Sequence, residues 1–416
     1  MCTTRGWTPA ALALCSALAV GLSAAPAAAD VSDLRLEQWG LDMVGAAEVW
    51  EEAQGSGVTV AVLDTGVVTD HPDLKDVTVG PDFTGHDLSS DSDGYGIHGT
   101  MMAGIVAASG HGVEHTGGVM GVAPEAEILA IRITAEPDGP DRDSVDPGAL
   151  AAGIRYAVDE GAQVICLPLA GAEFSVQANE ADQEAIAYAV NHGVVVVASG
   201  GPLGEASYPA AYPGVLAVGS VGPDGSLSEF SSRGDHIAVT APGEEITVVD
   251  PDGGYTTVSG SDAAAAFVAG VAALIRGEFP QLKPEQVVEA ITSGAQAADP
   301  AAAGQPGYGA GVVNAPDAFT AAKSTADHVP PFDPELAEQL EEEPLIPYWM
   351  LWTGGAVFLI VAAVVATVVA HRRAADPYGF GKRKPEEPEE PEPVPTARRP
   401  VRGRRRRGRG RRGVSR

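Results

Sequence analysis

Short apolar runs alternate with longer alanine-rich stretches between residues 30 and 320. The runs are rich in Val and Ile and almost unbroken, which is typical of parallel strands covered on both faces. The alanine-rich stretches have the length and composition of helices. The alternation predicts an α/β fold in which a parallel sheet carries helices on both faces. The predicted strands are 58–63, 128–133, 163–167, 194–198 and 215–218, and the predicted helices are 99–108, 147–160, 178–191, 263–276 and 284–293.

A separate apolar run lies near the N-terminus. Arg5 is followed by the apolar run Ala10–Leu22 and then by the small residues Ala24–Ala29. This three-part order predicts that residues 1–29 are a secretory signal peptide, removed after Ala29. A retained anchor helix is disfavoured, because the run is too short to cross a bilayer.

The longest apolar run is Trp349–Ala370, which contains no charged residue. It has about the 20 residues needed to cross a hydrocarbon core, so one C-terminal transmembrane helix is predicted at 348–370. Glu341–Glu343 precede the run and His371–Arg373 follow it. The positive-inside rule therefore predicts a single-pass protein of the cell membrane, with its large N-terminal domain extracellular and its tail cytoplasmic.

Charge divides the chain in the same place. The net charge of −30 combines a tail near +10, from residue 370 onward, with a remainder near −40. The acidic part makes nucleic acid an unfavourable partner. Pro and Glu dominate 324–347, a predicted extended stalk, and recur early in the tail at 371–416 before the arginines at 404–412. Those arginines suit anionic headgroups or nucleic acid, but a solvated tail is the simpler interpretation.

The segment between signal and stalk, 30–323, has to fold without a disulfide. Cys2 and Cys15 fall within the predicted signal peptide, so Cys166 is alone after its removal. The fold must therefore depend on its apolar core, and the sequence predicts no cofactor.

Two motifs carry candidate chemistry. The apolar run Val60–Leu63 ends in Asp64-Thr65-Gly66, which places a carboxylate beyond the carboxyl end of a predicted strand. Pepsin-like enzymes also use Asp-Thr-Gly, but they need two copies and this chain has one. His98 follows 34 residues later in the pattern His-Gly-Thr-x-x-Ala-Gly, at the start of a small-residue helix.

With the segment Ser259–Gly270, these motifs resemble the subtilase family in type, order and spacing. The resemblance covers about residues 38 to 319. It implies a subtilisin-like sheet, a serine endopeptidase activity, and catalytic roles for Asp64 and His98. Further matching segments are His71–Leu74, Gly121–Pro124, Tyr208–Pro213, Phe230–Gly234 and Ala241–Gly243.

The flanking regions narrow the resemblance. The chain is similar to the mycosins, the subtilases associated with type VII secretion, in four features. These are the signal peptide, the lack of a large propeptide before Gln38–Asp42, the stalk and the single anchor. That resemblance implies polypeptide ligands in the cleft, and membrane proteins of a secretion complex as partners.

The chain departs from the family pattern at its chemical centre. Asp262 occupies the position of the nucleophilic serine, and Gly201 that of the oxyanion-hole asparagine. Ala266 replaces the usual proline, and Pro168 removes a backbone donor beside the substrate cleft. The cleft segment implied by the resemblance is Leu167, Pro168, Leu169, Ala170 and Gly171.

Asp262 has no hydroxyl proton for His98 to take, and its charge opposes a developing oxyanion. We therefore predict a pseudoprotease with a binding or scaffolding role, the alternative being an active serine endopeptidase that processes secreted proteins. Asp262 is predicted to cap its helix and, with Asp64, to flank His98 and favour its charged form. A carboxylate-based hydrolase is disfavoured, because His98 should separate the two aspartates.

An acidic loop contains Asp87, Asp91 and Asp93. Oxygen-rich loops can hold calcium, but this one lacks EF-hand spacing because His98 stands where the bidentate glutamate should be. A solvated loop is the favoured interpretation, and no metal site is predicted.

Overall fold

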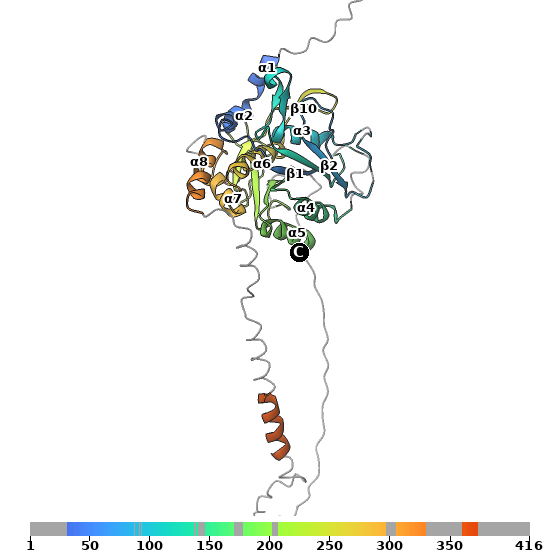
Figure 1. Cartoon of the computed structure of the whole chain (residues 1–416), viewed down its shortest axis with the longest axis vertical. Coiled ribbons are helices and arrows are strands. Elements are labelled where there is room, and N and C mark those ends of the chain that lie inside the picture. The colour runs from blue at the N-terminus through green and yellow to red at the C-terminus, as the bar shows by residue number, and fades with distance from the viewer. Residues whose placement is uncertain are drawn as a thin grey trace, which may run out of the picture. The chain divides into compact units, whose positions relative to one another are not determined.

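Figure 1 shows the computed structural model of the chain. Contacts divide the chain into two units, Met1–Asp333 and Pro334–Arg416, which are described separately. The residues that the structure describes are 31–86, 88–90, 92, 94–136, 139, 146–169, 178–201, 207–296, 305–329 and 360–372.

The first unit is built on a seven-stranded sheet in the order β2-β5-β1-β6-β7-β8-β9, in which every neighbouring pair is parallel. The predicted parallel α/β fold is confirmed, and each of the five predicted strands is present. The two edge strands were not predicted. The strands are β1 (Thr59–Asp64), β2 (Val77–Asp82), β5 (Glu127–Arg132), β6 (Val164–Leu167), β7 (Val195–Ser199), β8 (Val215–Val221) and β9 (Val239–Pro242).

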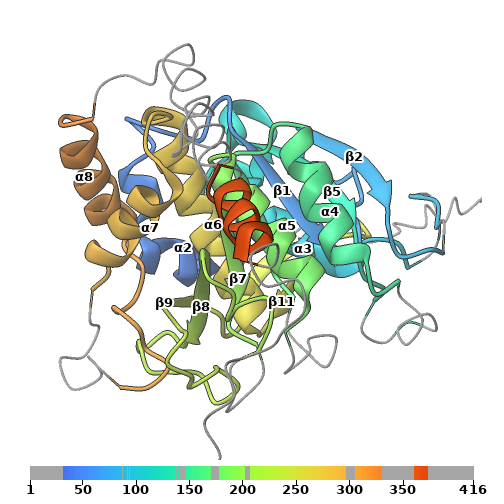
Figure 2. The same cartoon turned by 90° about the horizontal axis from the view of Figure 1, so that it is seen from below.

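Alternate residues of the strands point to opposite faces of the sheet and belong to two separate apolar layers. Val60 and Val62 of β1 pack with helices α3 and α6 on one face of the sheet, while Ala61 and Leu63 pack with α4 and α5 on the other. Figure 1 shows α3 and α6 above β1 and α4 and α5 below it, and Figure 2 shows the unit from the side of α4 and α5. This double coverage explains why the strands are almost entirely apolar. The four helices are α3 (Ile97–Ala107), α4 (Ala149–Asp159), α5 (Glu180–Asn191) and α6 (Ser261–Glu278).

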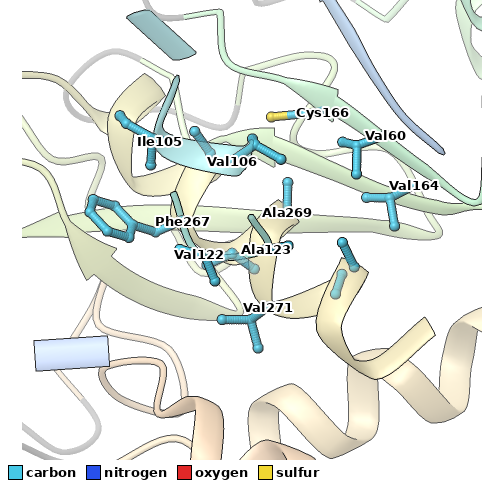
Figure 3. Packing of buried hydrophobic residues seen from close by; sticks show 14 of the residues in the cluster. Val60, Ile105, Val106, Val122, Ala123, Val164, Cys166, Phe267, Ala269 and Val271 are labelled. Carbon is cyan, nitrogen blue, oxygen red and sulfur yellow. The ribbon is translucent and has the colours of Figure 1, made fainter. Parts of the chain in front are cut away.

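Helix α6 is the most deeply buried of these helices, with every residue from Ala263 to Arg276 buried. Figure 3 shows Phe267, Ala269 and Val271 of α6 among side chains from β1, α3 and β6. Small residues allow this close packing. A side chain at Gly270 would meet Val122 at 2.5 Å, so only glycine fits against that loop.

Smaller elements complete the unit. The hairpins β3–β4 and β10–β11 are antiparallel. The last helix, α8, buries Ala318, Phe319 and Ala322 in the core. It ends three residues beyond the predicted boundary at 323, where Ala326 also packs against the core. The elements are α1 (Val31–Glu37), α2 (Trp39–Val44), η1 (Ala46–Glu48), β3 (Ser109–His111), η2 (Val113–His115), β4 (Gly117–Met120), β10 (Ile246–Asp250), β11 (Gly254–Val258), α7 (Pro284–Ser293) and α8 (Ala315–Ala326).

The described part of the second unit is a helix at 360–372. Its six isoleucine and valine side chains are between 44% and 63% exposed. Among the residues that the structure describes, no helix has both the length and the apolarity to span a bilayer. The predicted signal, residues 330–347 of the predicted stalk, and residues 348–359 of the predicted transmembrane helix lie outside the described ranges. The first residues of the predicted stalk, 324–326, belong to α8 and are not extended.

Candidate functional site

Asp64 is the last residue of β1, at the carboxyl edge of the sheet, and is fully buried. The backbone N–H of Thr65 donates to its Oδ1 over 2.6 Å. The Nδ1 of His98 lies 2.8 Å from its Oδ2 and 3.0 Å from its Oδ1. The end of β1 therefore places the carboxylate of Asp64 where it can accept a hydrogen bond from Nδ1 of His98.

His98 is the second residue of α3, and its second ring nitrogen meets Asp262. The distance from His98 Nε2 to Asp262 Oδ2 is 2.6 Å, and the two side chains are 20% and 15% exposed. The close approach of α3 to β1 requires Gly99, because a side chain there would collide with the carbonyl oxygen of Gly66. Asp64, His98 and Asp262 thus form one chain of contacts.

The ring of His98 lies in an anionic environment. Burial lowers the pKa of His98, but the charges of Asp64 and Asp262 and their hydrogen bonds outweigh burial and hold that pKa well above its ordinary value. The expectation that two carboxylates flank His98 and favour its charged form agrees with this geometry. Direct proton sharing between Asp64 and Asp262 does not fit it, because each carboxylate contacts a different ring nitrogen.

The prediction that Asp262 caps free amides at the start of its helix is confirmed, but Asp262 is not the N-cap residue. The N-cap of α6 is Gly260, which has no side-chain cap, and Asp262 is the second helical residue. Its Oδ1 accepts a hydrogen bond from the backbone N–H of the next residue, Ala263, over 2.9 Å. An anion in the first helical turn is still favourably placed, because the amides there are free and the helix dipole is positive at that end.

A third carboxylate lies at the same centre and was not predicted. Glu136 follows β5, the neighbour of β1, and accepts hydrogen bonds from the backbone N–H groups of Ile97 and His98. The sequence signal was an acidic residue three positions beyond the predicted strand 128–133, which runs beside the strand that ends in Asp64. Only the path of the chain beyond β5 shows that this residue reaches helix α3.

The position expected for the oxyanion donor has no room for a side chain. Gly201 is in the left-handed region with φ +79°. A Cβ at residue 201 would collide with Ser207 Oγ and lie 2.8 Å from Ser207 Cβ. The hydroxyl of Ser207 donates instead to the carbonyl oxygen of Gly200 over 3.2 Å.

The predicted cleft segment is described in part. Leu167 and Leu169 are buried in the apolar layer with α4 and α5, so their side chains belong to the core. The carbonyl oxygen of Leu169 accepts a hydrogen bond from Ser199 Oγ over 2.8 Å. Pro168 is also buried, whereas Ala170 and Gly171 lie outside the described residues.

The acidic loop cannot be placed, because Asp87, Asp91 and Asp93 lie outside the described residues. Within the described ranges, no group of three or more His, Cys, Asp or Glu side chains is arranged so that it could hold a metal ion. Cys166, in β6, is free and buried. Burial raises its pKa well above the ordinary value, with Asp64 and Asp262 adding to this effect, so it is held as the thiol.

An aspartate at the carboxyl edge of a parallel sheet, with a histidine from the first turn of one helix lying between it and the first turn of a second, buried helix, is the arrangement of the subtilisin-like class of folds. The sequence model of the subtilase family matches residues 55–311. The chain belongs to the subtilase family.

Relatives support this assignment. Thermitase from Thermoactinomyces vulgaris is 40% identical over 247 residues, covering 58% of this chain and 82% of thermitase. Mycosin-4 from Mycobacterium tuberculosis is 35% identical over 312 residues, covering 64% of this chain and 66% of mycosin-4. The crystal structure of MycP1 from Mycobacterium smegmatis is similar with a TM-score of 0.58 and 30% identity, covering 71% of this chain and 86% of MycP1. The mycosins are thus among its relatives.

Proposed function

We propose that this chain is a membrane-anchored subtilase homologue that binds polypeptides without hydrolysing them. One observation carries the proposal. The Oδ2 of Asp262 lies 2.6 Å from His98 Nε2, where the family resemblance places the nucleophilic serine. The nitrogen of His98 that would have to accept the serine proton is therefore in contact with a carboxylate instead of a hydroxyl.

The chemistry of acyl transfer supports inactivity. The serine mechanism needs a hydroxyl that the histidine deprotonates, and Asp262 provides none. Its negative charge also lies where a tetrahedral oxyanion would need stabilisation. In subtilisin, a member of the same family, loss of the nucleophilic serine lowers kcat by about 10⁶-fold.

The protonation state of His98 supports the same conclusion. A general base must be neutral to accept a proton, yet two carboxylates raise the pKa of this histidine well above its ordinary value. Gly201 further lacks the donor side chain, whose loss costs about 10² to 10³ in kcat in subtilisin. We infer that the centre is impaired at the nucleophile, the base and the oxyanion position together.

Peptide binding does not need the nucleophile. Subtilase-like clefts are bordered by chain segments with free backbone groups, and an extended peptide can pair with such an edge as an added strand. Here Pro168 removes one possible donor, so pairing on that side should be weaker. We propose that the retained function is recognition of an extended polypeptide.

We further propose that the domain is held outside the cell membrane by residues 348–370, after removal of the signal at 1–29. Support comes from the charge-free run Trp349–Ala370 and from its described part, a helix at 360–372 whose apolar side chains are exposed. The related MycP1 is described as an essential component of the type VII (ESX-1) secretion system. The partners we propose for this chain are secreted polypeptides and the membrane proteins of such an assembly.

A paired assay of hydrolysis and binding tests this function. The purified chain and its Asp262→Ser variant would each be incubated with a broad pool of unstructured peptides, followed by mass spectrometry for new termini. We expect no cleavage by the wild type, and saturable binding of some extended peptides in calorimetry. Cleavage by the wild type that His98→Ala abolishes would identify an active serine endopeptidase instead. The absence of binding at millimolar peptide would leave only a scaffolding role.

A further inference from the structure

Helix α3 begins without a cap of its own. Its N-cap residue is Gly96, with φ +67°, which has no side chain to accept the first free amides. The free N–H groups at a helix N-terminus are satisfied by water or by side chains from other segments. The amides in question belong to Ile97, His98 and Gly99, so the partners also determine where the backbone of His98 lies.

The partners come from two other segments. Glu136 Oε1 accepts the N–H of Ile97 over 2.7 Å, and Oε2 accepts the N–H of His98 over 3.3 Å. Thr65 Oγ1 accepts the N–H of Gly99 over 3.1 Å, and its side chain is hydrogen-bonded to Glu136. All three free amides are therefore satisfied by one carboxylate and one hydroxyl.

The backbone holds Glu136 at this place. The carbonyl oxygen of Asp64 accepts the N–H groups of Ile133 and Thr134, over 2.8 and 3.3 Å. The guanidinium of Arg132 donates to the carbonyl oxygen of Thr65 over 3.1 Å. The chain leaving β5 is thus tied to the end of β1 just before it reaches Glu136.

We propose that Glu136 is a positioning residue, which fixes the first turn of α3 so that the ring of His98 bridges Asp64 and Asp262. It contacts the backbone of His98 and not the ring, so it acts through the helix. Burial raises the pKa of Glu136, with the nearby charge of Asp64 contributing, while the hydrogen bonds of Thr65, Ile97 and His98 oppose this rise. The role concerns the geometry of His98 and does not depend on whether the cleft hydrolyses peptides.

The test uses residues 31–333, because the unit Met1–Asp333 holds every strand of the described structure and its own apolar core. Protein labelled with ¹⁵N-histidine would be compared as wild type, Glu136→Gln and Glu136→Ala, with the His98→Asn variant assigning the signals. The control is Glu184→Ala, which removes a glutamate that is 65% exposed and lies 3.9 Å from Arg155. The readouts are the His98 Nδ1–H signal and the titration of the His98 ring.

We expect a graded series. Glutamine keeps one acceptor for the Ile97 amide, so Glu136→Gln should retain a weakened Nδ1–H signal and an intermediate His98 pKa. Glu136→Ala should lose the signal to exchange with water, and its His98 pKa should fall furthest towards the ordinary value. Equal changes in both variants would show an effect of charge alone and overturn the proposal, as would a wild-type signal in Glu136→Ala. If Glu136→Ala does not fold, Glu136→Gln decides the matter, since signals and titration identical to wild type would contradict the role.

Discussion

The Nε2 of His98 lies 2.6 Å from Oδ2 of Asp262, while its Nδ1 lies 2.8 Å from Oδ2 of Asp64. One imidazole therefore joins the end of β1 to the first turn of α6. In a serine peptidase the contact at Nε2 belongs to the hydroxyl that attacks the substrate. Here both ring nitrogens face carboxylates, so the ring is held as an imidazolium and connects secondary-structure elements.

This bridge should make stability depend on pH. The folded-state pKa of His98 lies well above its ordinary value of 6.5, so its contribution to the free energy of unfolding is complete below pH 6.5 and is lost as pH rises through the folded pKa. The difference in free energy of unfolding between wild type and His98→Gln should therefore be largest below pH 6.5 and shrink at higher pH. Urea unfolding across this range measures it. A difference that grows with pH would contradict the charged bridge.

The core strands were predictable because each consists mainly of apolar residues, above all Val, Ile, Leu and Ala, covered on both faces. The edge strand β2 was not, since none of its residues is fully buried and its sequence includes Gly80 and Pro81, which disfavour a strand. Helix α6 was predictable from the alanine-rich stretch 263–276. Small residues at most of its positions permit close packing on several sides, as apolar residues do in the covered strands.

The centre was predictable only in part. Asp64, His98 and Asp262 were selected by motif resemblance, and the structure places them in contact. Glu136 depends on the path of the chain after β5, and no motif marks it. A side chain at Gly201 would collide with Ser207, six residues further along the chain, and residue types alone do not specify this contact.

That collision changes how activity should be restored. Asp262→Ser supplies a hydroxyl, and we expect hydrolysis of a fluorogenic peptide to rise from none to a low rate. Adding Gly201→Asn should increase the rate of hydrolysis only slightly, because the Cβ of residue 201 would collide with the side chain of Ser207. Asparagine does tolerate the positive φ of this position. Adding Ser207→Gly should then raise kcat by about 10² to 10³, the usual effect of one oxyanion donor. Ser207→Gly with Asp262→Ser alone is the matched control. If the double mutant Asp262→Ser/Gly201→Asn were as fast as the triple mutant, Ser207 would not obstruct the asparagine side chain.

Membrane orientation is testable on intact cells. Acidic residues precede the apolar run Trp349–Ala370 and basic residues follow it, so an added protease should digest the region before Tyr348 and spare an epitope at the C-terminus. Permeabilised cells are the control, in which the epitope should be digested too. Loss of the epitope from intact cells would reverse the proposed orientation.

The most direct test of inactivity is labelling with a fluorophosphonate, a reagent that reacts with an activated serine. We predict that the wild-type chain stays unlabelled, whereas Asp262→Ser is labelled at residue 262 and loses the label when His98→Ala is added. Ser261 is the internal control, because its hydroxyl is buried and lies 3.2 Å from that of Ser199. Labelling of the wild type at any serine, dependent on His98, would contradict the account.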